Sequence, residues 1–467
     1  MRNASPQLRL PYATSGGQKN GTLNKVNAED QSAHRWYRFV LSFPPHLVRD
    51  YLGKFGANKD SRVLDPFSGT GTTLVECKKL GIPSVGFEAH PVAQFAAQVK
   101  LQWSVEPDAL LNHARRVAEA ALSALEIAGF DDSGQCFDLT RKQISGLQSL
   151  PQESADLLLT GSISPLPLHK TLILLREIEH LHDPRYCQHE LLALARTAVY
   201  AVSNLHFGPE VGVQRPKADA AVIGPWLREM SNIADDLVTL RQTAIVPAIV
   251  HLADARAVVT KYLPPNSVDI VITSPPYPNE KDYTRTTRLE SILLGFIKNK
   301  AELKALKKTL VRSNTRSVYK SDDDDRWIAD HEEIQRVASM IERRRIQLGK
   351  TSGFERLYAR VTKLYFGGMV RHLRQLTEVL KPGARLAYVV GDQASYLRVM
   401  IRTGHILADL AERLGFEVLS IDLFRTRLAT ATKEQLREEV VVLRWPGKVI
   451  SRSRIAIHDG SPPPERP

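Results

Sequence analysis

Cysteine is scarce in this sequence, with three residues among 467, and long hydrophobic runs are missing. The cysteines, Cys77, Cys136 and Cys187, stand far apart and have no CxxC or Cys/His spacing. We therefore expect neither a disulfide framework nor a structural zinc site. No apolar tract approaches the length that spans a bilayer, and the first residues lack the apolar core of a secretion signal. These absences predict a soluble, cytoplasmic protein that does not bind a membrane.

Acidic residues do not outnumber basic ones in this chain. The chain carries 63 Lys and Arg against 51 Asp and Glu, a formal charge of +12. Positive charge in such excess attracts polyanions, of which nucleic acid is the commonest, but many basic proteins bind no nucleic acid. A chain of 467 residues is too long for one ordinary core, so we expect a catalytic domain with a second domain or large insertions.

Short apolar segments that read as strands alternate with helical patterns. The strands lie at residues 61–67, 83–90, 267–277, 384–392, 416–424 and 438–445. Helical patterns include Thr72 to Leu80 and Tyr365 to Leu380, and a Lys-Pro-Gly stop ends the second. The alternation indicates a mostly parallel sheet with helices on both faces. Only a short polar link joins the last two strands, so they are expected to pair antiparallel at one edge.

Two stretches interrupt this alternation and set the expected domain boundaries. Residues 101–245 are rich in Ala and Leu and read as a helical insertion, whereas residues 296–360 read as a polar, basic helical insertion. The remaining expected parts are a flexible arm (1–30), a catalytic domain in three pieces (31–100, 246–295 and 361–450) and a disordered tail (451–467).

The sequence DPFSGTGTT (65–73) follows a strand and opens a helix. Gly69 and Gly71 allow the backbone to approach a ligand closely, and the helix start directs backbone N–H groups toward it. A phosphate-binding P-loop would need a lysine here, and a dinucleotide fingerprint would need a third glycine where Leu74 stands. The turn could also be purely structural.

Two acidic residues suggest which ligand this turn binds. Asp65, just before the turn, suits a cationic amino-acid group, and Glu88, at the end of the next strand, can accept hydrogen bonds from a ribose diol. An ammonium group and a ribose without phosphates describe S-adenosylmethionine. Asp65 could instead be a turn or helix-capping residue.

A second motif, TSPPY (273–277), ends another apolar strand at the same edge of the predicted sheet. Pro275 and Pro276 stiffen the loop and remove two backbone donors. The loop therefore presents carbonyl oxygens and the Ser274 hydroxyl in a fixed arrangement. Such acceptors can hold a planar amine on which the ring of Tyr277 stacks, although the same letters also occur in ordinary turns.

Together the two motifs resemble those of the DNA amino-methyltransferases, which act at cytosine N4 or adenine N6. HRWYRFVLSFPPHLV (34–48) is similar to the segment that covers the methionine end of the cofactor in that family, and HLADAR (251–256) resembles the segment before the catalytic motif. LKPGARLAYVVGD (380–392) looks like the strand that lines the target-base pocket. The resemblance covers about 34–100 and 250–445 and leaves both insertions out.

The resemblance implies a class I methyltransferase fold, which is a Rossmann-like, mostly parallel seven-stranded sheet with helices on both faces. It implies that S-adenosylmethionine is the cofactor, with Asp254 near its adenine. The expected cofactor-binding residues are Pro44, Asp65, Pro66, Phe67, Gly69, Gly71, Thr72, Thr73, Glu88 and Asp254, and the expected catalytic residues are Ser274, Pro275, Pro276 and Tyr277.

The implied reaction is direct methyl transfer to an exocyclic amino group, without a covalent enzyme intermediate and without a metal. The Ser274 oxygen and the Pro275 carbonyl would hold the amino protons and aim the nitrogen lone pair at the methyl group. The target base would have to be flipped out of a duplex and stacked on Tyr277. Serine at position 274 favours cytosine N4 over adenine N6, in a restriction-modification or defence setting with possible cognate proteins.

The region that recognises DNA is expected in one of the two insertions, and their charges indicate which insertion it is. Residues 101–245 carry 12 basic against 18 acidic side chains, whereas residues 296–360 carry 16 against 10. Double-stranded DNA should prefer the second insertion, although charge runs are often only solvated helix faces. The expected DNA-binding residues are Lys304, Lys307, Lys308, Arg312, Arg316 and Lys320.

Three other functions share parts of this pattern. RNA amino-methyltransferases have a similar glycine-rich turn and PPY loop, and protein-glutamine methyltransferases use an Asn-Pro-Pro-Tyr loop. A catalytically silent nucleic-acid-binding protein would show damaged cofactor residues, yet Asp65, Gly69, Gly71 and Glu88 are all present. The sequence leaves open the recognition sequence, the oligomeric state and the meaning of HFGPEVG (206–212).

Overall fold

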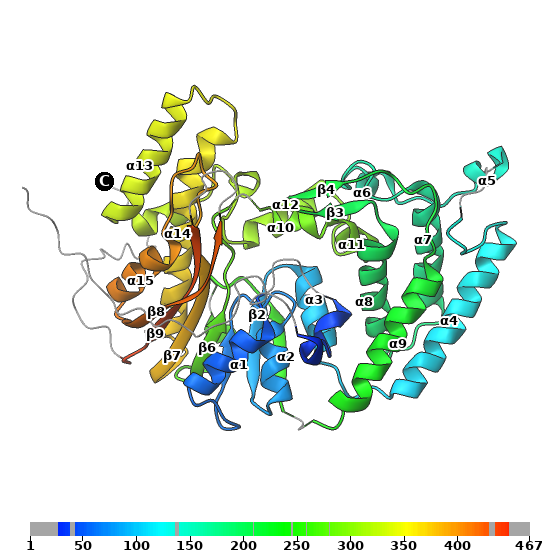
Figure 1. Cartoon of the computed structure of the whole chain (residues 1–467), viewed down its shortest axis with the longest axis horizontal. Coiled ribbons are helices and arrows are strands. Elements are labelled where there is room, and N and C mark those ends of the chain that lie inside the picture. Colours follow the sequence, from blue (N-terminus) through cyan, green and yellow to red (C-terminus); the bar gives the residue numbers. More distant parts are fainter. Residues whose placement is uncertain are drawn as a thin grey trace, which may run out of the picture.

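The computed structural model carries side chains and describes most of the chain (Figure 1). The described residues are 27–37, 43–135, 140–208, 210–243, 246–257, 259–279, 281–428 and 435–447. The expected tail (451–467) and nearly all of the expected arm (1–30) lie outside these ranges. Short helical turns at the start of the described chain are η1 (Ala28–Asp30) and η2 (His34–Trp36).

A seven-stranded sheet forms the centre of the chain outside the two insertions, in the order β5-β2-β1-β6-β7-β9-β8. Its strands are β1 (Val63–Asp65), β2 (Ser84–Glu88), β5 (Ala248–Leu252), β6 (Val268–Thr273), β7 (Leu380–Gly391), β8 (Glu417–Leu428) and β9 (Gln435–Arg444). The first five in spatial order are parallel, and β9 runs antiparallel to both β7 and β8. The expected α/β class and the antiparallel edge pair are confirmed.

Helices cover both faces of this sheet because successive strand residues point to opposite sides. On one face Ala387 and Val389 of β7 join a core with α1 (Pro45–Lys54). On the other face Leu386 and Tyr388 pack with α14 (Tyr358–Thr377), α15 (Thr403–Arg413) and α13 (Glu332–Gln347). The helices that follow β1 and β2 are α2 (Thr72–Lys79) and α3 (Pro91–Lys100).

The insertion at 101–245 forms a helical lobe beside the sheet, to the right in Figure 1. Its elements are α4 (Pro107–Ile127), α5 (Arg141–Ser145), α6 (Gln152–Ala155), α7 (Pro165–His180), α8 (Cys187–Thr197), η3 (Ala198–Val202), β3 (Leu205–Phe207), β4 (Val211–Val213) and α9 (Ile223–Leu240). Apolar faces of these helices bury Val117, Leu174 and Trp226 in one core, which also includes Ala96 of α3. The segment at 206–212 that the sequence left open is an antiparallel β3–β4 hairpin.

The basic insertion at 296–360 packs against the catalytic part of the chain. Its elements are α12 (Lys300–Thr309), η5 (Thr315–Ser317), η6 (Asp324–Ile328), α13 and η7 (Glu355–Leu357). Ile334 and Ile341 of α13 are buried in the core that α14 shares with the sheet. Short elements before it are η4 (Val259–Lys261), α10 (Tyr283–Thr286) and α11 (Arg288–Leu293).

The expected helix boundary near Leu380 is wrong by a few residues. Helix α14 ends at Thr377, and Lys381 to Gly383 form an irregularity early in β7 rather than a stop between elements. The pairing of β7 with β6 shifts there, from Val268–Leu380 to Ile270–Arg385. Gly383 has a φ of 87°, which lets the chain turn inside the strand.

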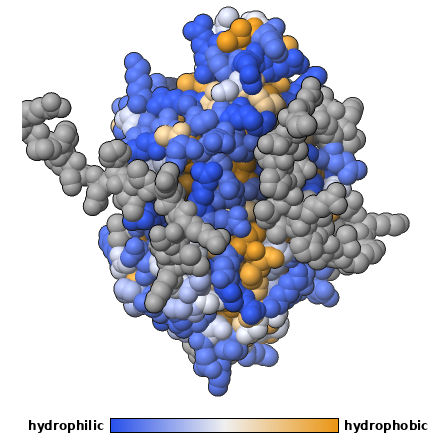
Figure 2. All heavy atoms as spheres, turned by 90° about the vertical axis from the view of Figure 1, so that its left-hand side faces the viewer, coloured by the Kyte–Doolittle hydropathy of each residue, from blue (hydrophilic) through white to orange (hydrophobic). Residues whose placement is uncertain are grey.

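The face that carries α13 to α15 is mostly hydrophilic, with apolar side chains at its upper tip and in a patch below its middle (Figure 2). Exposed large apolar side chains near the end of α13 and in the loop after it are Ile346, Leu348 and Phe354. Within the described part of the chain, no helix is both long and apolar enough to cross a membrane.

Candidate functional site

The carboxyl ends of four parallel strands meet at one cavity of about 700 Å³, a size typical of small-molecule sites. Both motifs from the sequence line it, although they are some 200 residues apart in the chain. The predicted residues that line it are Pro44, Pro66, Phe67, Gly69, Thr72, Glu88, Asp254, Ser274, Pro275, Pro276 and Tyr277. Asp65, Gly71 and Thr73 are not wall residues of this cavity, because they lie buried behind the turn.

The glycine-rich turn needs its glycines for different reasons. Gly71 has a φ of 84°, and a Cβ there would stand 3.0 Å from the Cβ of Ala97 on α3. Gly69 has a φ of 52°, and a Cβ on it would meet nothing within 4 Å. The Ser68 hydroxyl donates to the Phe87 carbonyl at 2.8 Å and ties the turn to β2. The packing of Gly71 against Ala97 and the Ser68–Phe87 hydrogen bond together fix the conformation of the turn beside the cavity.

Asp65 is fully buried beneath the turn. Its Oδ1 accepts hydrogen bonds from the Thr273 hydroxyl at 2.6 Å and the Phe67 N–H at 3.1 Å. Its Oδ2 is buried without a hydrogen-bond partner among the described residues. Burial raises the pKa of Asp65 to about 6, an effect that the Thr273 hydroxyl partly offsets. Asp65 thus links the end of β6 to the turn and keeps one acceptor oxygen uncommitted.

Glu88 stands at the end of β2 and lines the cavity. Its two carboxylate oxygens accept from the backbone N–H groups of Gly69 and His90, both at 2.8 Å. These bonds orient the carboxylate and leave lone pairs for a further donor. Burial raises the pKa of Glu88 to about 7 despite the two backbone donors.

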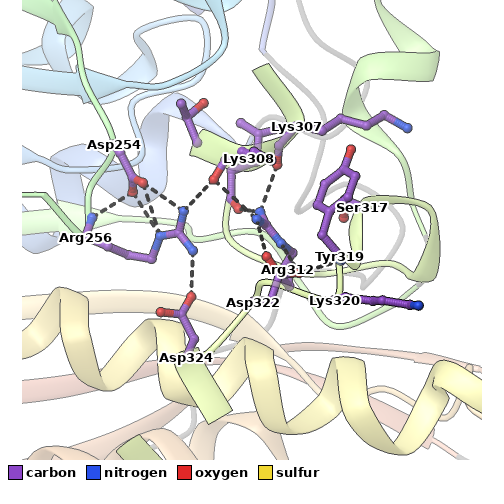
Figure 3. Close-up of polar contacts among 12 residues, drawn as sticks. Asp254, Arg256, Lys307, Lys308, Arg312, Ser317, Tyr319, Lys320, Asp322 and Asp324 are labelled. Atoms are coloured by element: carbon purple, nitrogen blue, oxygen red, sulfur yellow. Dashed lines mark hydrogen bonds and ion pairs between the residues drawn. The ribbon is translucent and has the colours of Figure 1, made fainter. Parts of the chain in front are cut away.

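Asp254 follows β5 and lines the end of the cavity that lies farthest from β6. The Arg256 side chain grips both carboxylate oxygens, with Nε 3.0 Å from Oδ1 and Nη2 2.8 Å from Oδ2. Figure 3 shows this pair and its connection to the basic insertion. The arrangement fixes the direction in which Asp254 presents its remaining lone pairs.

The loop after β6 supplies the polar and aromatic groups at the other end of the cavity. The Ser274 hydroxyl donates to the Val389 carbonyl at 3.1 Å, so its oxygen can accept from another donor. Tyr277 is partly exposed to the cavity, and its ring lies against Gly391, where a Cβ would stand 3.1 Å from the ring. Burial, followed by the charge of Glu438, raises the pKa of Tyr277, so the phenol stays neutral at physiological pH.

Several known proteins have sequences similar to this chain. A family model named N6_N4_Mtase and described as DNA methylase matches residues 15–98, which include the glycine-rich turn. Type II methyltransferase M.BsoBI of Geobacillus stearothermophilus is 25% identical over 451 residues, 89% of this chain and 85% of the relative. Type II methyltransferase M.AvaI of Nostoc sp. is 25% identical over 450 residues, 88% and 86% of the two chains. Type II methyltransferase M.MjaII of Methanocaldococcus jannaschii is 45% identical over 69 residues, 15% of this chain and 13% of the relative. These matches support the DNA amino-methyltransferase family for this chain.

The cavity of this methyltransferase also contains residues that the sequence did not single out. They include Glu210, Lys281, Asn314, Gln393, Arg425, Arg427 and Glu438. Arg425 donates to Glu438 at 2.5 Å, and both line the cavity together with the loop after β6. The RTR pattern in the link between the last two strands was the available signal for Arg425 and Arg427. For Asn314 and Glu210 the sequence holds no signal, because only folding brings them to the cavity.

Two of the six residues expected to bind DNA instead form ion pairs with other residues of the methyltransferase (Figure 3). Arg312 is 3% exposed, and its guanidinium binds Asp322 and the carbonyls of Lys307 and Lys308. The Lys307 ammonium lies 2.9 Å from Asp282 in the cavity wall. The structure thus buries Arg312, and its guanidinium caps the end of α12.

The other four expected DNA-binding residues are exposed on the insertion: Lys304, Lys308, Arg316 and Lys320. Lys304 and Lys308 both approach the ring of Tyr319, each at 6.0 Å from its centroid. Arg316 is weakly paired with Glu210 of the β3–β4 hairpin, at 3.8 Å. Two acidic residues of the same insertion, Asp322 and Asp324, bind buried arginines.

Proposed function

We propose that this methyltransferase transfers a methyl group from S-adenosylmethionine to the exocyclic amino group of a flipped base in double-stranded DNA, with cytosine N4 as the favoured target. One observation carries the proposal. A single cavity is lined at one end by the glycine-rich turn and Glu88 and at the other by Ser274 to Tyr277. A donor site and an acceptor site for a methyl group are therefore continuous.

The order of the strands suggests how the cofactor would lie. Strands β5, β2, β1 and β6 are neighbours, so Asp254, Glu88, the turn and Ser274 follow one another along one sheet edge. A methyl group near Ser274 and a ribose diol on Glu88 would place the adenine at Asp254. The open space at Gly69 fits an amino-acid group of the cofactor near the turn, and Asp65 would support that turn from behind. The bound cofactor would supply an electrophilic methyl group.

The protein's part in the reaction is to position and polarise a poor nucleophile. The lone pair of an exocyclic amino group is delocalised into the ring of the base. Hydrogen bonds from the amino protons to the Ser274 oxygen and the Pro275 carbonyl would concentrate electron density on nitrogen and orient it. The ring of Tyr277 would stack on the extruded base and so help to offset the cost of unstacking.

Two further features support the choice of substrate. Serine, rather than aspartate or asparagine, opens the Pro-Pro-Tyr loop, which favours cytosine N4 over adenine N6. The exposed lysines and arginine of the basic insertion would bind phosphates of the duplex. The relatives' names, Type II methyltransferases, suggest a restriction-modification role in a prokaryotic cell with a cognate restriction partner.

Incubation with S-adenosylmethionine labelled on the methyl group tests the proposal. Duplex DNA, single-stranded DNA and total RNA are offered separately, and the products are digested to nucleosides. We expect label in duplex DNA as N4-methylcytosine. N6-methyladenine would overturn the choice of base, label only in RNA would overturn the choice of substrate, and no transfer to any polymer would overturn the function itself.

A further inference from the structure

Arg256 lies behind the far end of the cavity and donates hydrogen bonds with all three guanidinium nitrogens. Nε and Nη2 bind the Asp254 carboxylate, and the Arg256 N–H also donates to Asp254 Oδ1, at 2.9 Å. The Arg256 side chain is 6% exposed, and Arg256 is not a wall residue of the cavity. Arg256 therefore contacts a cavity residue without facing the cavity itself.

The other side of Arg256 binds the basic insertion (Figure 3). Its Nη1 donates to Asp324 Oδ2 at 2.6 Å, and its Nη2 donates to the Lys308 carbonyl at 3.1 Å. The second oxygen of Asp324 accepts from Arg371 on α14 at 2.7 Å. The chain of contacts thus runs from the cavity through Asp254 and Arg256 to Asp324 of the insertion.

Helix α14 is shaped to receive Asp324. A Cβ on Gly367 would stand 1.8 Å from the Asp324 carbonyl oxygen, and one on Gly368 would stand 3.3 Å from Asp324 Oδ2. Glycine inside a helix is less favourable than alanine. The presence of these two glycines allows the backbone of η6 to lie directly against the helix, which fixes the Asp324 carboxylate beside Arg256.

This buried geometry determines how Asp254 can act. A carboxylate has about four lone-pair sites, and Arg256 occupies most of those on Asp254. An acceptor held by a bidentate arginine cannot rotate, so it discriminates between a donor and an acceptor placed opposite it. A 6-amino group is a donor, whereas a 6-oxo group is an acceptor.

We propose that Arg256 is a positioning residue for cofactor recognition, which Asp324 holds in place. It aims the Asp254 carboxylate at the amino group of the cofactor's adenine, and the basic insertion thereby supports selection of adenine in the cofactor. The inference rests on the proposed function, because it assumes that the adenine of S-adenosylmethionine lies at Asp254.

Calorimetry with two ligands tests the inference. S-adenosylhomocysteine carries the 6-amino group, and S-inosylhomocysteine carries oxygen in its place. We expect the unmodified enzyme to prefer the first by about ten- to hundredfold, the value of one hydrogen bond to a charged acceptor. Arg256→Gln and Asp324→Asn should reduce this preference to about threefold or less. Arg256→Lys should not restore it, because an ammonium group cannot grip a carboxylate at two points.

Arg371→Gln is the matched control, since it removes the other partner of Asp324 and leaves Arg256 and Asp254 paired. It should keep the preference for the amino ligand. Equal weakening of both ligands by Asp324→Asn, with the preference intact, would show that the network only stabilises the fold and would overturn the inference. Failure of the unmodified enzyme to bind S-adenosylhomocysteine would instead overturn the proposed cofactor, so the two failures are distinguishable.

Discussion

Acidification is expected to weaken cofactor binding through Glu88. Burial raises the pKa of this carboxyl group to about 7, and only its charged form can accept hydrogen bonds from both hydroxyls of a ribose. The affinity for the cofactor is therefore highest well above pH 7 and decreases as the pH falls through 7. With one proton competing against the ligand, the Kd should rise about tenfold between pH 8 and pH 6.

Calorimetric titration of S-adenosylhomocysteine at several pH values between 6 and 8 measures this effect. Glu88→Gln should bind more weakly at pH 8 and show a nearly flat profile, because no proton then competes. Asp65, whose pKa is raised by burial to about 6, contributes mostly below this range, so Asp65→Asn should keep the slope. A slope that survives in Glu88→Gln, or a flat profile in the unmodified enzyme, would refute the assignment of Glu88 to the ribose.

Three further predictions concern the reaction, the fold and DNA binding. Ser274→Ala should slow single-turnover methyl transfer by about 100-fold while the Kd values for duplex and cofactor change little; equal losses in all three would count against its catalytic role. Gly71→Ala should lower the free energy of unfolding by about 1–3 kcal/mol, measured by urea denaturation, because of its positive φ and the close Ala97 side chain; unchanged stability would contradict the packing argument. Lys304→Ala and Lys308→Ala should each reduce the slope of log K against log salt by about 0.9 in duplex binding, and an unchanged slope would place the DNA elsewhere.

Local features of the sequence were enough to predict six of the seven strands of the sheet and the motifs at the two ends of the cavity. The apolar runs that end at Asp65, Glu88 and Thr273 are β1, β2 and β6. Because parallel strands end at the same edge of a sheet, the motifs after them had to meet there. Strand β5 was not among the predicted strands, and Asp254 was expected only from the resemblance to the family.

Charge along the sequence was a poorer guide, because it does not reveal which charges pair. The excess of basic residues at 296–360 suggested six DNA contacts, yet Arg312 is buried with Asp322 and Lys307 binds Asp282. The same insertion also contains Asp324, whose carboxylate binds Arg256. Such pairings join residues up to 68 positions apart and depend on the packing of η6 against α14.

The sequence by itself determined the chemistry available at the cavity, since the glycine-rich turn, Glu88 and the Ser-Pro-Pro-Tyr loop are local motifs whose backbone geometry follows from nearby residues. Tertiary structure decided the rest. It brought Asn314 and Arg427 to the cavity wall, turned Arg256 toward both Asp254 and Asp324, and left Lys304 and Lys308 exposed. The physical reason is burial, because a charged side chain is removed from water only where folding supplies a partner, and that partner is chosen by packing between distant elements.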